Sequence, residues 1–154
     1  MPQIGTIMKT RSLMALILAS ALATTAAAQN VEYSSVKTKK VAVATTAANG
    51  QKLAYLCTDH PEVTALVVEI PPGGETGWHL HEVPVYAYML EGTITVELGE
   101  GRSHVFNKGD AIFEVRFTSH NGRNTGGKPA KMIVLYTGEE GKPNVTRTPV
   151  PENK

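Results

Sequence analysis

The feature that most limits how this chain can fold is a succession of short runs rich in valine, isoleucine, threonine and tyrosine, each bounded by glycine, proline or asparagine. Runs of this length and composition are typical of β-strands. They are KVAVATT (40–46), KLAYLC (52–57), TALVVEI (64–70), TGWHLH (76–81), VYAYML (85–90), TITVEL (93–98), SHVFN (103–107), AIFEV (111–115), SHNGRN (119–124) and KMIVLYT (131–137). From residue 29 onward, no segment keeps a helical period over ten or more residues. In a chain of 154 residues, this pattern predicts one all-β domain, a sandwich or a barrel.

The first 28 residues have the order of a secretory signal. A basic patch at Lys9 and Arg11 precedes an apolar run over 13–23 and small residues that end at Ala28. The apolar run is shorter than the roughly 20 residues that a bilayer span needs. We therefore expect cleavage after residue 28 and export of the protein to a periplasm or to the medium; the alternative is a surface or core helix.

Removal of residues 1–28 would leave 13 basic and 14 acidic side chains. Because no basic stripe remains, we exclude nucleic acid and anionic membranes as partners. The single cysteine, Cys57, excludes an intrachain disulfide and is interpreted as a small buried hydrophobe rather than a redox or ligand residue. Around a barrel at 40–140 we expect an N-terminal arm at 29–39 and a flexible tail at 141–154.

Two histidines one residue apart, His79 and His81, are the first candidates for chemistry. In a strand, side chains two residues apart point to the same face, so both imidazoles would project to one side. Two imidazoles so placed can share one cation. Taken alone, however, such a pair is more often two hydrogen-bonded or exposed histidines.

The surroundings of this pair contain two longer patterns. The first is a glycine, five residues, His-x-His and a closing glycine, and the second is a glycine, a late histidine and an asparagine. Their residues are Gly73, His79, His81 and Gly92, then Gly109, His120 and Asn124. These spacings resemble the two signature motifs of the cupin superfamily. The resemblance covers roughly residues 64–137, the greater part of the chain that follows the signal.

The resemblance implies a cupin-type jelly-roll β-barrel, with His79 and His81 on one wall of a cavity and His120 on the other. Three converging imidazoles would bind a divalent transition metal (iron, copper, nickel, zinc or manganese) and leave positions open for water or substrate. Most cupins add a glutamate ligand seven residues before the closing glycine, where this chain has Val85. Cupins such as the thiol and diketone dioxygenases work with three histidines alone. Without the acid, softer ligands remain, and these favour transition metals over magnesium or calcium.

Two further residues are candidates for proton transfer. Glu114 lies in the otherwise apolar run AIFEV, where a carboxylate needs a cation or a hydrogen-bond donor. It is either a fourth ligand or general base, or an outward-facing residue beside Arg116. His104 is a candidate acid–base group at the cavity, although a lone strand histidine more often faces solvent.

Strand parity predicts the walls of the cavity. If Val85 faces inward, Ala87 and Met89 share its apolar wall, and Tyr86 and Tyr88 face the other way. Apolar strand residues usually serve the core, where we also expect Phe113, Phe117, Met132 and Val134.

Two functions fit this sequence. The first is a metal-dependent enzyme of dioxygenase or lyase/isomerase type that acts on a small organic molecule, with Glu114 or His104 moving protons. The second is a non-catalytic cupin that binds or senses a small ligand. A vacant coordination position favours chemistry, whereas a fourth protein ligand favours a structural ion. We also expect a homodimer, formed through the tail or the strand near Lys40, because an exposed sheet edge needs cover.

Overall fold

The computed structural model describes residues 35–151, so the predicted signal at 1–28 lies outside the described residues. The chain divides into a unit of residues 1–37 and a unit of residues 38–154, and the second unit carries the barrel. Its strands are β1 (Pro61–Ile70), β2 (His79–Leu80), β3 (Val85–Glu91), β4 (Thr93–Glu97), β5 (Ser103–Asn107), β6 (Ala111–Phe113), β7 (Asn121–Arg123), β8 (Ala130–Glu139) and β9 (Thr146–Arg147). Over residues 35–151 the structure has no helix, and so none that is long and apolar enough to cross a membrane.

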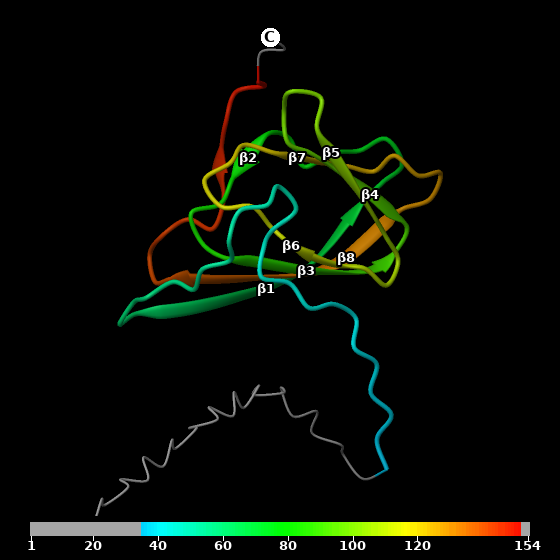
Figure 1. Ribbon diagram of the computed structural model, residues 1–154. Coiled ribbons are helices and arrows are strands. Elements are labelled where there is room, and N and C mark those ends of the chain that lie inside the picture. Colours follow the sequence, from blue (N-terminus) through cyan, green and yellow to red (C-terminus); the bar gives the residue numbers. More distant parts are fainter. Residues whose placement is uncertain (1–34, 152–154) are drawn as a thin grey trace, which may run out of the picture. The chain divides into compact units, whose positions relative to one another are not determined.

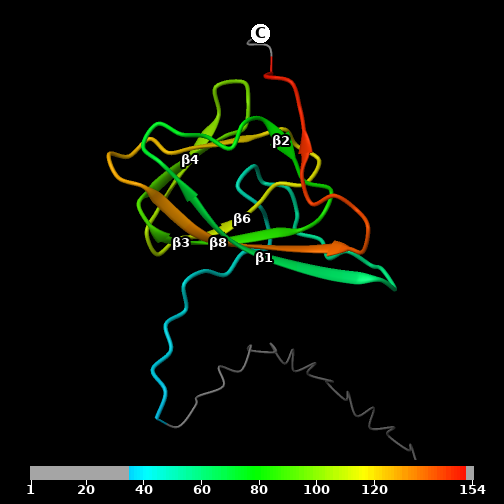
Figure 2. The same cartoon turned by 180° about the vertical axis from the view of Figure 1, so that it is seen from behind.

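The strands of the second unit form two layers that face each other (Figures 1 and 2). The lower layer in both views is a four-stranded antiparallel sheet in the order β1-β8-β3-β6. The upper layer contains the antiparallel sheet β5-β4-β7 and the short antiparallel pair β2-β9. The all-β fold predicted from the short punctuated runs is therefore confirmed.

Alternation along the strands decides which side chains fill the space between the layers. In β3, Val85, Ala87 and Met89 are buried, whereas Tyr86 and Tyr88 face the other way, as parity predicts. The buried cluster continues across the neighbouring strands with Ile94, Ile112, Ala130, Met132, Val134 and Tyr136. A chain with one cysteine has no internal disulfide, so this burial is the main source of its stability.

The turn between β3 and β4 depends on Gly92. Its φ angle is +72°, and a Cβ atom there would lie 2.5 Å from the carbonyl oxygen of Pro129. Glycine alone adopts this angle without strain and leaves room for that close approach. The glycine that closes the first motif is thus required by the backbone, not by the chemistry of the cavity.

Two of the predicted strands are wrong. Residues 40–46 and 52–57 form no strand, and a single bridge between Thr46 and Lys52 joins them. Alternating composition is not sufficient here, because neither segment pairs with an edge of the two layers in the described part of the chain. Cys57, at the end of the second segment, is exposed, so its interpretation as a buried hydrophobe is also wrong.

The tail at 141–154, predicted to be flexible, is partly built into the barrel. Its strand β9 pairs with β2, and the backbone N–H of Thr148 donates to the carbonyl of Trp78 over 3.1 Å. Backbone pairing needs no apolar side chains, so the polar, proline-containing sequence gives no sign of it. Residues 144–148 of this tail are thus bonded to the barrel, whereas its flexibility stays a prediction.

Phe117 is another correction, because it is 61% exposed and does not serve the core. Its φ angle of +55° lies in the left-handed region, which turns the chain sharply between β6 and His120. The guanidinium group of Arg116 lies 4.9 Å from the centre of its ring. The turn directs this side chain outward, where a cation covers it.

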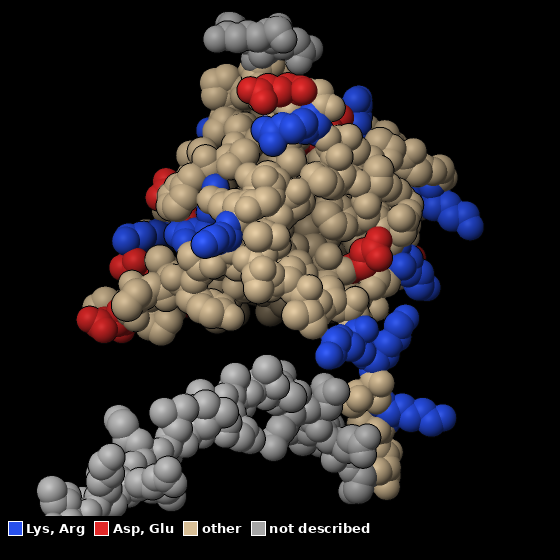
Figure 3. All heavy atoms as spheres, viewed as in Figure 1, with Lys and Arg blue, Asp and Glu red and all other residues tan. Residues whose placement is uncertain are grey.

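Charged side chains contribute little to holding the layers together. Figure 3 shows them mostly toward the rim of one face, with both signs interspersed and a largely uncharged middle. Most ion pairs are exposed, as between Lys131 and Glu69 at 3.7 Å. Exposed pairs of this kind typically add less than about 1 kcal/mol.

Candidate metal centre

Three histidines converge between the two layers. His79 lies in β2, His81 follows that strand, and His120 exchanges two backbone hydrogen bonds with His79, of 3.0 and 2.8 Å. The ring centroids are 4.9 Å apart for His79 and His81, 4.4 Å for His79 and His120, and 5.0 Å for His81 and His120. All three side chains are buried. Residues 41 positions apart in the chain are thereby brought to one point.

Backbone carbonyl groups fix the orientation of each imidazole. The Nδ1-to-oxygen distances are 2.7 Å (His79 to Gly77), 2.9 Å (His81 to Asn144) and 2.9 Å (His120 to Thr118). A carbonyl oxygen can only accept, so each Nδ1 carries the proton and donates it. Each Nε2 is then left with a free lone pair, the form in which a histidine ligates a metal. One ring nitrogen of each histidine lies within 4.8 Å of the others, a spacing at which the set could hold one ion.

The Nε2 atom of His120 supplies an independent test of this fit. It is a buried side-chain nitrogen without a hydrogen-bond partner, and the described residues contain no other such atom. Leaving a buried polar atom unsatisfied typically costs about 1–3 kcal/mol. A cation bound by the three Nε2 atoms would remove that cost, so the donor set fits a divalent transition metal.

The protonation of the cluster also suits a metal. Burial lowers the pKa of His79 and of His120, against the opposing effect of the carbonyl that accepts from each Nδ1. Burial likewise lowers the pKa of His81 to about 4, again against the bond to Asn144. At neutral pH the three imidazoles are therefore uncharged and do not have to lose a proton before they bind an ion.

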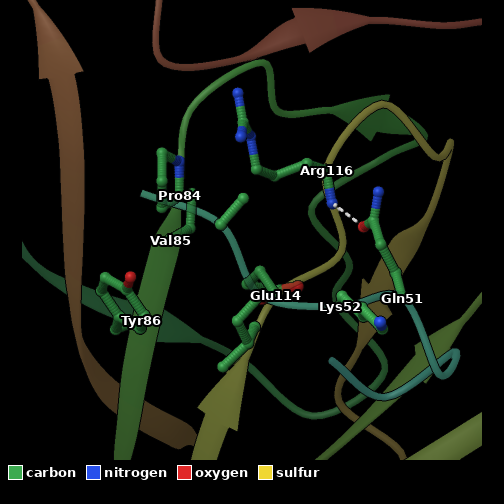
Figure 4. Close-up of a pocket in the computed structure, with 9 residues that line it drawn as sticks. Gln51, Lys52, Pro84, Val85, Tyr86, Glu114 and Arg116 are labelled. Carbon is green, nitrogen blue, oxygen red and sulfur yellow. Dashed lines mark hydrogen bonds between the residues drawn. The ribbon is translucent and has the colours of Figure 1, made fainter. Parts of the chain in front are cut away.

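Glu114 lies directly beside the cluster. Its Oε2 atom is 3.4 Å from Nε2 of His120, without a hydrogen bond between the two atoms, and its side chain is 15% exposed. Burial raises the pKa of Glu114 to about 7, with a smaller opposing effect from His79. On its other side, Glu114 lies with Val85 in the wall of a shallow pocket that the histidines do not line (Figure 4). The backbone N–H of Arg116 donates a hydrogen bond to the side chain of Gln51 in the same pocket. A carboxyl group with this pKa can either take up or release a proton near pH 7.

The histidines and Glu114 line one cavity between the layers, with a volume of about 60 Å³. Apolar side chains from both sheets form most of its remaining wall: Val68, Val85, Ile94, Val96, Ile112, Met132 and Val134. Val85 thus occupies the wall where most cupins have a glutamate. A cavity of this size has room for an ion and a few small ligand atoms, and is well below the roughly 300–1,000 Å³ of drug-sized sites.

Tyr136 is a member of this wall that sequence reasoning missed. It is buried on β8, and its ring lies 5.6 Å from that of His81. Burial, and then the charge of Glu114, raise the pKa of its hydroxyl. Strand parity with Met132 and Val134, both assigned to the core, is the signal that would have found it.

His104 stays outside the site, which corrects its assignment as an acid–base candidate. It lies on β5, the edge strand of the three-stranded sheet, opposite Val96, and it is exposed. Val96 on β4 is buried, but its partner His104 is exposed, as are four of the five residues of β5 in all. Of the two predicted proton-transfer residues, the fold therefore brings only Glu114 to the histidines.

Residues 66–136 match the family model described as Cupin domain. That segment runs from β1 to β8 and contains His79, His81, Glu114 and His120. Residues 66–136 therefore form a cupin domain.

Solved structures of three enzymes resemble parts of the chain. The polyketide cyclase RemF from Streptomyces resistomycificus is 27% identical, over 59% of this chain and 63% of its own, with a TM-score of 0.49. The oxalate decarboxylase of Lactobacillus farciminis, as a formate complex, is 24% identical over 50% and 24%, with a TM-score of 0.45. The DMSP lyase DddQ from Ruegeria pomeroyi is 23% identical over 56% and 43%, with a TM-score of 0.49. The chain thus spans less than two thirds of each structure's length, and no curated protein matches it.

Proposed function

We propose that this protein is a metal-dependent enzyme in which His79, His81 and His120 hold one divalent transition metal. The observation that carries the proposal is the arrangement of the three rings, each with Nδ1 bonded to a carbonyl and Nε2 left free. The buried, unpartnered Nε2 of His120 supports it independently. Imidazole donors suit iron, copper, nickel or zinc, and also manganese when oxygen ligands complete the shell.

The reaction we infer is of dioxygenase or lyase/isomerase type on a small organic molecule. A bound divalent ion would supply Lewis acidity toward a substrate oxygen. Glu114 would take a proton from the substrate or return one, because its carboxyl group lies beside the histidines with a pKa near neutrality. The apolar wall would exclude bulk water, and the volume of about 60 Å³ limits the part of the substrate that can enter.

The alternative is a cupin that binds or senses a small ligand without changing it. The volume of the cavity does not separate the two functions, because an ion with its waters would limit the room for a substrate and for a bound ligand alike. Closure of the site by Glu114 as a fourth ligand would favour the alternative. The two functions therefore differ in whether Glu114 is a metal ligand or a proton carrier.

Export and pairing remain predictions. Export depends on residues 1–28, whose sequence has the order of a secretory signal. A homodimer formed through the tail has less support than the sequence suggested, because residues 146–147 already pair within their own chain. A proposed dimer has a different apolar surface available on the outer face of β1 and β8, which includes exposed Val63 and Val67.

Elemental analysis of the untagged protein tests the proposed function. We expect about one equivalent of a transition metal in the wild-type protein and none in the His79→Ala, His120→Ala double variant. His104→Ala is the matched control, since this histidine is exposed on β5, and it should keep the metal. Absence of metal from the wild-type protein, even after reconstitution with each candidate ion, would contradict the proposal. Retention by the double variant would contradict the assigned ligands.

A further inference from the structure

The C-terminal segment of residues 144–148, here called the strap, lies along the strand that carries the first histidine. Its strand β9 pairs with β2, with His79 opposite Arg147 and Leu80 opposite Thr146. The strap is fastened at its far end as well, where the hydroxyl groups of Thr148 and Ser119 lie 2.5 Å apart. Because β2 has two residues, it depends on neighbours on both sides to hold its position.

His81 depends on this strap in a way that the other two histidines do not. The carbonyls of Gly77 and Thr118 that hold His79 and His120 lie two residues away in the chain. The carbonyl that holds Nδ1 of His81 belongs to Asn144, 63 residues away. A local turn therefore orients two of the rings, whereas a tertiary contact orients the third.

The side chain of Asn144 fixes the position of that carbonyl. Its Nδ2 atom donates to the hydroxyl of Thr64 on β1 over 3.0 Å. Its Oδ1 atom lies over Gly138 on β8, where an added Cβ would come within 2.8 Å of it. The amide is thus held between β1 and β8, two strands that contribute no histidine to the cluster.

We infer that Asn144 is a positioning residue, which orients His81 for metal binding through its backbone carbonyl and is itself held by a hydrogen bond to Thr64, in space that Gly138 leaves free. The inference rests on the proposed metal site. The strap lies outside the two cupin motifs, because Asn144 follows the segment 66–136 that matches the family. The inference therefore gives a role to a part of the chain that those motifs do not describe. Loss of the Asn144 side chain would release the carbonyl that orients His81, whereas the carbonyls that orient His79 and His120 lie in their own local turns.

The tautomer of His81 tests this inference without any metal. In long-range ¹H–¹⁵N spectra of the metal-free full-length protein, we expect His81 to carry its proton on Nδ1. Asn144→Ala should convert it to a mixture of both tautomers, and Gly138→Ala should act in the same direction by pushing on the Asn144 amide. Lys142→Ala, an exposed change in the adjoining turn, should leave the spectrum unchanged. An unchanged His81 tautomer in folded Asn144→Ala would overturn the inference.

The affinity for Zn²⁺ gives the second measurement. We expect Asn144→Ala to weaken Zn²⁺ binding by about 10–100-fold, the usual effect of losing a partner that orients a ligand. If Asn144 acts through His81, the double variant with His81→Ala should bind no more weakly than His81→Ala alone. Additive losses would instead show a general structural effect and overturn the inference. If the wild-type protein binds no Zn²⁺ or other candidate ion, the proposed function fails, and the tautomer measurement still decides the role of Asn144.

Discussion

The two faces of the β1-β8-β3-β6 sheet are both rich in apolar side chains, but only one of them is covered. On the inner face, Val85 and Met89 are 2% and 0% exposed, because the second layer lies over them. On the outer face, Val67 is 64% exposed and Ile133 on the adjacent strand is 37% exposed. Hydrophobicity alone therefore does not identify the core face of this sheet. The layer that carries the histidines determines which face is the core face, because the cavity forms on the side of the sheet against which that layer packs.

Among the single changes that test the difference between the covered and the open face, Val85→Glu should have the largest effect on stability. It would place a carboxylate on the covered face, where a buried charge without a partner costs about 3–5 kcal/mol. We expect the metal-free variant to lose stability by that amount at pH 8, and bound Mn²⁺ or Zn²⁺ to restore most of it by pairing with the new carboxylate. Chemical denaturation with and without the metal measures both effects. Full stability without metal would mean that residue 85 does not face the cavity.

Met89→Ala should follow in size. This side chain is fully buried on the covered face, and removing it leaves a cavity that typically costs about 2–5 kcal/mol. Urea denaturation should give a loss in this range. Zn²⁺ binding by the folded variant should stay unchanged, because Met89 is not part of the cavity that the histidines line. A large loss of affinity in the folded variant would contradict the separation of the core from the site.

Glu114→Gln should change stability in a pH-dependent way. Because the pKa of Glu114 is raised from 4.5 to about 7, the folded protein binds this proton more tightly than the unfolded chain does. The contribution of Glu114 is therefore fully present below about pH 4.5 and is lost as the pH rises through about 7. The amide removes this loss, so the metal-free variant should be more stable than the wild type at pH 8, by up to about 3 kcal/mol at 1.36 kcal/mol per pKa unit, and nearly equal at pH 4.5. Equal stability at both pH values would show that the carboxylate is solvated.

Val67→Lys should have the smallest effect on folding. The side chain lies on the open face, where substitutions usually change stability by no more than about 0.5 kcal/mol. Its effect should instead be on pairing, since two copies that meet through this face would bury the added charge. Analytical ultracentrifugation should show a dimer for the wild type and a monomer for the variant, with similar melting temperatures for both. A wild-type monomer at micromolar concentration would contradict the predicted dimer.

Much of the fold could be predicted from the sequence. The short runs between residues 61 and 139 are rich in valine, isoleucine, threonine and tyrosine, and they correctly predicted the all-β fold; strand parity then correctly predicted which residues of β3 share the buried face. The same composition failed at 40–46 and 52–57, because such a run becomes a strand only where a neighbouring strand offers hydrogen bonds. The spacing of the glycines and histidines around His79, His81 and His120 was enough to predict that the three rings meet at one site.

The contacts that orient the histidines could not be predicted from the sequence, and the reason is physical. Asn144 contributes a backbone carbonyl, which every residue has, and its bond to His81 spans 63 residues. No spacing rule connects two such positions. His104 shows the opposite error, since its residue type suggested chemistry and its place on an exposed edge strand removes it from the cavity. Residue type and local pattern therefore identified the ligands but not what holds them.

We propose that three imidazoles, without a carboxylate at position 85, bind one transition metal in this protein. X-ray absorption spectroscopy of the Zn²⁺-loaded full-length protein tests this binding most directly, because imidazole rings give a distinctive multiple-scattering pattern from which their number can be derived. We expect three imidazoles with at least one further light ligand, and two imidazoles in the His120→Ala variant. A wild-type spectrum with no imidazole, or one unchanged by His120→Ala, would contradict it.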